Sequence, residues 1–324
     1  MNESGAAMSG GSSAAATGNS STAASGVAVA RLEAALKPTW CPGCGNFAMW
    51  RALKEVLEEL GLGFEEFAVV WGIGCHGNGA DFLACQGFHG LHGRALPLAT
   101  GIALSNPELK VIVEMGDGDG YGIGGNHFLH SVRRNIDLTA IFHNNQIYGL
   151  TTGQASPTSD QFMKTPSTPG GVVEEPVNPV GVAVAQGATF VARGFAGDIP
   201  HLKSLYRQAI EHRGFALVDV FQPCVTWNKV NTFAWFRERV YKLEEKDGYD
   251  PTSRTMAFEE SLTTFHELTC APDECRVPIG VFYREEGVPT YQDGLPQLDR
   301  PMWQHAREPR DISRTLEAYV VGGE

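Results

Sequence analysis

Two polar turns each follow an apolar run and carry residue types that bind divalent cations. Asp117, in a Gly-Asp-Gly turn, follows the apolar residues 111–115, and Asn145, in an Asn-Asn pair, follows residues 138–142. Their separation is about one strand–helix–strand crossover, so both side chains reach the same edge of a parallel sheet. Mg²⁺ prefers oxygen ligands and shares phosphate oxygens, and glycines let backbone amides face a diphosphate. Gly-Asp-Gly alone is most often an ordinary turn, but the pair at this spacing favours a magnesium and diphosphate site.

Four cysteines are predicted to meet near the same place. Cys41 and Cys44 form a C-x-x-C pair just before a helix, while Cys75 and Cys224 each follow a predicted strand. On its own, a C-x-x-C pair can be half of a zinc site, a redox dithiol or half of an iron–sulfur site, and a zinc site is the favoured interpretation. Four thiolates beside Asp117 suit an electron-accepting cluster better than a zinc ion, because zinc has no redox chemistry.

The other three cysteines are predicted to have no role in this cluster. Cys85 is expected in a helix as a buried thiol, and Cys270 and Cys275 in an irregular arm as structural or incidental residues. A reducing compartment makes disulfides unexpected. The chain has no C-x-x-C-x-x-C-x-x-x-C-P run, so electrons from a single cluster must leave to a separate carrier.

Alternating helical and strand patterns position these residues. Apolar periodicity predicts helices at 46–60, 126–134 and 199–213, and strands at 67–71, 111–115, 138–142 and 215–221. Such alternation predicts an α/β fold with a mostly parallel sheet and helices on both faces. From about Lys229 the pattern degrades into charged, Pro-containing stretches, which predicts a C-terminal arm.

Composition bounds the location and the partners. The 324 residues carry a formal net charge of −12, which argues against nucleic-acid or anionic-membrane partners. No apolar run is long enough for a transmembrane helix. Residues 1–30 lack Lys and Arg, so they predict no signal or transit peptide, and a cytoplasmic location is expected. The expected division is a disordered Ser/Ala/Gly-rich tail at 1–25, a cofactor-binding domain at 26–230 and an arm at 231–324.

Several motifs in one order carry a family resemblance. The polar turns resemble the cofactor motif of thiamine diphosphate enzymes, and the whole chain resembles the beta subunit of 2-oxoacid:ferredoxin oxidoreductases, most closely the 2-oxoglutarate type. The matching blocks are WCPGCGNFA, GIGCHG, FHGLHGRALPLATGIAL, MGDGDGYGIGGNHFLHSVRRNID, HNNQIYGLTTGQASPTS and QPCVTWNKVNTFAWF. They extend from Trp40 to about Phe236, with a weaker match through PIGVFYRE.

The resemblance implies roles for individual residues. It places thiamine diphosphate against Ile73, Gly74, Cys75, His76, His92, Gly118, Asp119, Gly149 and Leu150. It implies Mg²⁺ ligation by Asp117, Asn145 and the carbonyl of Ile147, and ligation of one 4Fe-4S cluster by Cys41, Cys44, Cys75 and Cys224. His76 departs from the family pattern, in which Ser often follows the third cluster cysteine.

The implied activity is CoA-dependent oxidative decarboxylation of a 2-oxoacid, with electrons passed to ferredoxin. 2-Oxoglutarate is the favoured substrate and pyruvate the next. The expected partner is the alpha subunit, or a fused gamma-alpha subunit, which supplies the Glu that activates the aminopyrimidine. We therefore assign no catalytic residue to this chain.

Two alternatives stay open. A non-oxidative thiamine diphosphate decarboxylase or synthase needs no cluster. A non-enzymatic, metal-stabilised dinucleotide-binding module is suggested by the Gly-rich residues 72–77, although Cys and His there replace the usual small residues.

Overall fold

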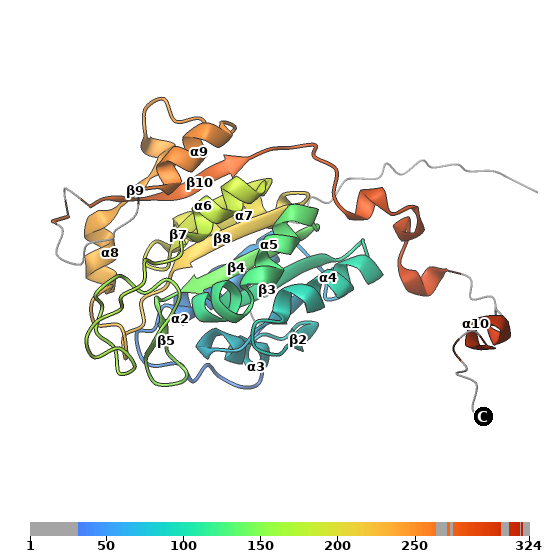
Figure 1. Cartoon of the computed structure of the whole chain (residues 1–324), viewed down its shortest axis with the longest axis horizontal. Coiled ribbons are helices and arrows are strands. Elements are labelled where there is room, and N and C mark those ends of the chain that lie inside the picture. The colour runs from blue at the N-terminus through green and yellow to red at the C-terminus, as the bar shows by residue number, and fades with distance from the viewer. Residues whose placement is uncertain (1–31, 264–270, 273–274, 306–310, 318, 320–324) are drawn as a thin grey trace, which may run out of the picture.

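A central sheet organises the chain. A computed structural model describes residues 32–263, 271–272, 275–305, 311–317 and 319. The sheet has eight strands in the order β2-β1-β3-β4-β8-β7-β10-β9 (Figure 1). In chain order the strands are β1 Phe67–Trp71, β2 Gly87–His89, β3 Lys110–Gly116, β4 Leu138–Asn144, β7 Phe190–Phe195, β8 Phe215–Phe221, β9 Val240–Lys242 and β10 Val277–Arg284. Neighbours from β2 to β7 pair in parallel, β10 runs antiparallel to β7, and β9 runs parallel to β10.

Helices cover both faces of the sheet, as predicted for an α/β fold. One face carries α4, α5, α6 and α9, and the other carries α2 and α7. The helix bounds are α2 Asn46–Glu59, α3 Gly79–Phe82, α4 Ala95–Ser105, α5 Gly125–Arg134, α6 Pro179–Gln186, α7 Ile199–Glu211, α8 Phe233–Arg239, α9 Arg254–Ser261 and α10 Ser313–Glu317. No helix among the described residues is both long and apolar enough to span a membrane.

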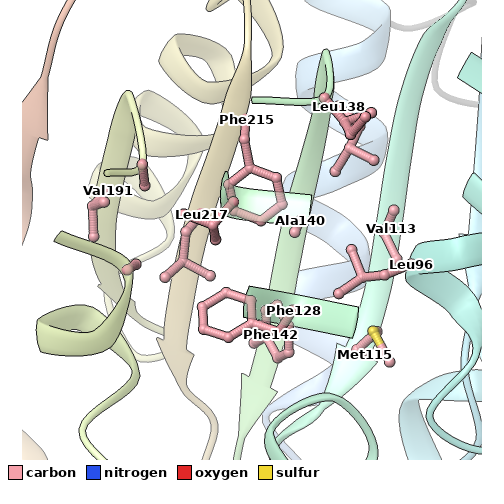
Figure 2. Close-up of a cluster of buried hydrophobic side chains, with 14 of the residues drawn as sticks. Leu96, Val113, Met115, Phe128, Leu138, Ala140, Phe142, Val191, Phe215 and Leu217 are labelled. Carbon is pink, nitrogen blue, oxygen red and sulfur yellow. The ribbon is translucent and has the colours of Figure 1, made fainter. Parts of the chain in front are cut away.

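Strand alternation builds two cores. On β3, Val113 and Met115 face the α4 and α5 side, while Ile112 faces α2 and α7. Figure 2 shows the first core, in which Phe128 of α5 and Phe142 of β4 lie beside Met115. These continuous apolar strands are typical of parallel sheets that are buried on both faces. They hold the carboxyl ends of β1, β3, β4 and β8 at one edge.

The strands and helices that were predicted by residue range are all present, and their ends differ from the prediction by at most two residues. The structure adds elements that we did not predict, among them α4, α6, β7 and β10. β10 belongs to the stretch predicted as an arm, yet it extends the main sheet, and α9 packs against it and α6. Beyond β10, residues 285–292 stay against the sheet through hydrogen bonds to Asn135, Asp137 and Thr189. The later described residues lead away from it as short helical turns (Figure 1). The domain division at residue 231 stays a prediction.

Two expectations about cysteines are wrong. Cys85 is not in a helix, because α3 ends at Phe82 and the chain becomes extended at Leu83, which bridges to Glu33. Cys85 lies in the following bend, half-buried against the α2 and α7 core. Cys275 is disulfide-bonded, although no disulfide was expected. That expectation rested on the cellular compartment and not on geometry. Cys270 lies outside the described residues.

Candidate active site

One cavity lies at the carboxyl ends of β1, β3 and β4. It has a volume of about 100 Å³. Every residue predicted to contact thiamine diphosphate or magnesium lines it: Ile73, Gly74, Cys75, His76, His92, Asp117, Gly118, Asp119, Asn145, Ile147, Gly149 and Leu150. Gly116, Tyr148 and Thr151 complete the lining. Parallel α/β sheets bind ligands at this edge.

Asp117 is buried directly after β3. Its Oδ2 accepts hydrogen bonds from Ser156 Oγ at 2.5 Å and from Thr158 Oγ1 at 2.7 Å. Burial raises the pKa of Asp117 to about 6, and the hydrogen bonds from Ser156 and Thr158 limit the rise. A cation at the other carboxylate oxygen would favour the charged form.

Asn145 lies across the cavity on the turn after β4. Its Oδ1 accepts from the backbone N of Ile147 at 3.1 Å, and its Nδ2 donates to Gln222 Oε1 at 3.2 Å. Gln146, with φ 59°, makes the tight turn between Asn145 and Ile147. A carboxylate, an amide oxygen and a backbone carbonyl form the hard donor set that Mg²⁺ prefers, so these residues fit the predicted metal.

The turn that begins at Gly118 has no space for a side chain. A Cβ at Gly118 would lie 2.2 Å from Cε1 of Tyr148, whose hydroxyl donates to the Gly118 carbonyl at 2.9 Å. From Gly118 the chain continues as one turn of π-helix, η3 Gly118–Ile123. Gly118 therefore lines the cavity with backbone alone, which suits a diphosphate cradle.

Asp119 also lines the cavity and contacts three of its neighbours there. Its Oδ1 accepts from the backbone N of Gly93 at 2.6 Å and contacts His92 Nδ1 at 2.7 Å. Its Oδ2 lies 3.7 Å from His76 Nε2, and both buried atoms lack a hydrogen-bond partner. Burial opposes ionisation of Asp119, but the nearby His76, Gly93 and His92 outweigh it and hold its pKa below the ordinary value. Two buried polar atoms without partners fit a cavity that accepts a polar ligand.

His76 fills the position where the family pattern often has Ser. It is buried, and its ring packs against the backbone at Gly74 and Gly116, where added Cβ atoms would lie 2.7 Å and 3.1 Å from Cε1. Burial lowers the pKa of His76, so the imidazole is held in its neutral form.

The four predicted cluster cysteines lie close together beside this cavity. A Cβ at Gly149 would lie 3.6 Å from Cys75 Sγ and 3.7 Å from Cys224 Sγ. Burial raises the pKa of Cys44 to about 12 and that of Cys75 to about 11, and in both cases neighbouring thiols including Cys41 and Cys224 raise it further. Thiols of this kind become thiolates when a metal binds them.

The cluster itself stays a prediction. In the described part of the chain, no three Cys, His, Asp or Glu side chains gather closely enough to hold a single metal ion. A four-iron cluster is wider than one ion and needs its cysteines farther apart. The donor chemistry of four neighbouring thiols therefore fits an iron–sulfur cluster.

A buried polar pair beneath the cavity was not predicted from the sequence. Glu114 of β3 contacts Nε2 of His143 on β4, and Nδ1 of that histidine lies 2.9 Å from Asn46 Oδ1. Burial raises the pKa of Glu114 to about 8 and lowers the pKa of His143 to about 3. The pair is therefore neutral at pH 7, with the proton on Glu114. In the sequence, this pair is indicated by Glu114, a charged residue within the apolar run 111–115.

Other missed residues come from the long loop after β5 Ile147–Tyr148, which pairs with β6 Gln154–Ala155. Ser156 and Thr158 reach Asp117, and Thr151 lines the cavity. All three residues fall within the matching block HNNQIYGLTTGQASPTS, but no local pattern in it predicted a contact with Asp117.

Comparison with known proteins places this site in a class. Residues 72–220 match the family "Thiamine pyrophosphate enzyme, C-terminal TPP binding domain". Residues 224–300 match the family of C-terminal regions of the pyruvate ferredoxin oxidoreductase beta subunit. The first match includes β3, β4 and every residue that lines the cavity. The fold and site therefore define a thiamine diphosphate-binding domain.

Similar proteins narrow the class to one family. The chain is 45% identical to the 2-oxoacid:ferredoxin oxidoreductase subunit beta of Saccharolobus solfataricus, over 81% of this chain and 88% of that protein. It is 47% identical to the 2-oxoglutarate oxidoreductase subunit KorB of Mycobacterium tuberculosis, over 58% of this chain and 51% of that protein. The 2-oxoglutarate:ferredoxin oxidoreductase from Magnetococcus marinus, solved with 2-oxoglutarate, coenzyme A and succinyl-CoA bound, superposes with a TM-score of 0.79 and 34% identity, covering 91% of this chain and 96% of that chain.

The chain belongs to the beta subunits of the 2-oxoacid:ferredoxin oxidoreductases. Membership implies an alpha subunit as partner. It also sets aside the non-enzymatic dinucleotide-binding module, since the Gly-rich residues 72–77 form part of the thiamine diphosphate domain.

Proposed function

We propose that this chain is the cofactor-binding subunit of an enzyme that oxidises 2-oxoglutarate, with pyruvate as the next candidate. The overall reaction converts a 2-oxoacid and CoA into acyl-CoA, CO₂, a proton and two electrons. The two electrons leave one at a time through a 4Fe-4S cluster to ferredoxin. Relatives named for 2-oxoglutarate, and the solved structure that contains it, support this substrate preference.

The observation that carries the proposal is the position of Cys75. It lines the cofactor cavity and also neighbours Cys224 at Gly149. One residue therefore belongs to both the cofactor site and the cysteine group. An electron acceptor held here would lie beside the cofactor, which favours oxidation over the simple decarboxylation of the non-oxidative alternative.

The protein's contribution is to bind and orient. Thiamine diphosphate, when bound, supplies the nucleophilic carbon and the electron sink that decarboxylation needs. Asp117, Asn145 and the Ile147 carbonyl would hold Mg²⁺ against the diphosphate. His92, whose Nδ1 contacts Asp119, lines the cavity at the diphosphate end. Cys41, Cys44, Cys75 and Cys224 would hold the cluster.

The aminopyrimidine end of the cofactor requires a carboxylate that this cavity does not provide. Its described lining contains Asp117 and Asp119 and no Glu, and both aspartates are engaged at the diphosphate end. Glu114 of β3 is turned away, toward His143. The activating Glu is therefore expected from the alpha subunit, with the cofactor at the interface.

The test is CoA-dependent reduction of a viologen dye under anaerobic conditions, with the chain alone and with its alpha subunit. We expect activity only with the alpha subunit, a dependence on CoA, and a higher kcat/KM with 2-oxoglutarate than with pyruvate. A higher kcat/KM with pyruvate would overturn the substrate assignment. Full turnover by the chain alone would place the missing carboxylate within it.

A further inference from the structure

The carboxylate of Asp117 accepts hydrogen bonds from Ser156 and Thr158, two loop residues to which the proposed function assigns no role. Residues 151–178 connect the cavity to α6 and contain only the short strand β6. Such long irregular loops are uncommon in compact domains unless they are functional or disordered. This loop is ordered by burial: Ser156, Thr158, Ser159 and Asp160 are all less than 9% exposed.

Buried hydrogen bonds fix the loop to the turn that carries Asn145. Gln146 Nε2 donates to the Thr158 carbonyl at 3.1 Å and to Asp160 Oδ1 at 2.8 Å. Ser159 Oγ donates to the Gln146 carbonyl at 2.6 Å. The loop and the turn that carries Asn145 therefore form one hydrogen-bonded unit.

Two hydroxyls of this unit converge on one oxygen of Asp117. Ser156 Oγ and Thr158 Oγ1 lie 2.5 Å and 2.7 Å from Oδ2. A carboxylate oxygen that accepts two such bonds is fixed in direction, and Oδ1 is left to point elsewhere. The two hydroxyls thus select which oxygen meets a cation in the cavity.

The two hydroxyls differ in the acceptors that compete for their single proton. Thr158 has one proton and two acceptors within reach, Asp117 Oδ2 and Asn144 Oδ1 at 2.9 Å. The Asn144 amide cannot turn freely, because its Nδ2 donates to Asp219 Oδ1 at 3.1 Å. The hydroxyls of Thr158 and Ser159 lie 3.4 Å from Ser156 Oγ, much farther than Asp117 Oδ2 at 2.5 Å, so the Ser156 proton goes to Asp117. Thr158 shares its proton between Asp117 Oδ2 and Asn144 Oδ1, and so it connects the Asp117 carboxylate to the last residue of β4.

We propose that Ser156 and Thr158 are positioning residues that orient Asp117 for Mg²⁺ and so set the affinity for magnesium and thiamine diphosphate. This inference rests on the proposed role of Asp117 as a metal ligand. Groups that hydrogen-bond to a metal ligand typically change metal affinity by about 10- to 100-fold when they are removed. Neither hydroxyl needs to touch the metal or the substrate.

The test measures magnesium binding in the complex with the alpha subunit, after the cofactor and metal have been removed. Calorimetric titration with Mg²⁺ at fixed thiamine diphosphate gives a Kd that does not depend on turnover. Ser156→Ala and Thr158→Val should each raise this Kd by about 10- to 100-fold. Thr158→Ser, which keeps the hydroxyl, should restore the wild-type Kd.

A matched control removes a buried hydroxyl from the same fold at another place. Thr139 of β4 is buried and donates to the Ala209 carbonyl of α7 at 3.0 Å. Thr139→Val should lower the melting temperature without changing the Kd. A wild-type Kd in both Ser156→Ala and Thr158→Val would overturn the inference, as would a Thr158→Ser variant as weak as Thr158→Val.

Asp117→Ala is titrated in the same way, because it distinguishes failure of the positioning role of Ser156 and Thr158 from failure of the proposed function. Lost binding in Asp117→Ala together with unchanged binding in the hydroxyl variants would refute only the positioning role. Unchanged binding in Asp117→Ala would refute the magnesium site itself.

Discussion

The wild-type protein should lose folding stability as the pH rises past neutrality, and Glu114→Gln should abolish this pH dependence. In the folded protein the pKa of Glu114 is raised by burial from its ordinary value of 4.5 to about 8. Between these values the folded state keeps a proton that the unfolded chain has lost. Stability therefore falls as the pH rises through the folded-state pKa. His143 does not titrate in this range, because burial lowers its pKa to about 3.

The magnitude follows from the size of the shift. One pKa unit is worth about 1.4 kcal/mol, so from pH 6.5 to pH 8.5 the loss of the Glu114 proton costs about 2 kcal/mol. For a chain of this length that corresponds to roughly 3 °C in the melting temperature. Gln is close in shape to the protonated acid, and its amide can donate to Nε2 of His143. The variant should therefore fold with the same contacts but without the titration.

The assay is thermal unfolding of wild type and Glu114→Gln at intervals between pH 6.5 and 8.5, with cofactor content held constant. Wild type should lose about 2 kcal/mol relative to the variant across this range. Glu59→Gln serves as the control, because its hydrogen bond to Lys203 lowers the pKa of Glu59 and removes it from the window. Parallel curves for wild type and Glu114→Gln would refute a neutral Glu114 in the folded state.

Further predictions concern the two cofactor sites. Asp117→Ala should abolish calorimetric binding of thiamine diphosphate with magnesium while iron content stays at the wild-type level. Gly118→Ala places a Cβ 2.2 Å from Tyr148 Cε1, so it should destabilise the chain by about 1–3 kcal/mol and weaken cofactor binding, as unfolding and calorimetry would show. Iron analysis should find a normal cluster in Cys85→Ser and lost iron in Ser variants of Cys41, Cys44, Cys75 and Cys224.

The parts of the fold that the sequence predicted are those with an unbroken local pattern. β1 is a pure apolar run that ends at Gly72, and β3 and β4 end in polar turns. β7 was missed because Arg193 and Gly194 interrupt it. Arg193 is buried there because its Nε donates to Asp219 of the neighbouring strand at 3.3 Å, a pairing that no local pattern contains.

The same distinction holds for the site. Residues at strand ends, such as Asp117 and Asn145, were predicted because topology alone brings strand ends together. Ser156 and Thr158 reach Asp117 from about 40 positions away through a loop, and only the folded chain shows that contact. α4 was missed because Pro97 lies in its first turn and Gly101 in its interior, which weakens the helical pattern.

The most direct test of the oxidative role is electron paramagnetic resonance on the anaerobic complex after mixing with 2-oxoglutarate and CoA. We expect the signal of a reduced 4Fe-4S cluster to appear together with succinyl-CoA, and to be absent in Cys224→Ser. Release of CO₂ and an aldehyde, with no cluster signal in the wild-type complex, would contradict the account and identify a non-oxidative decarboxylase.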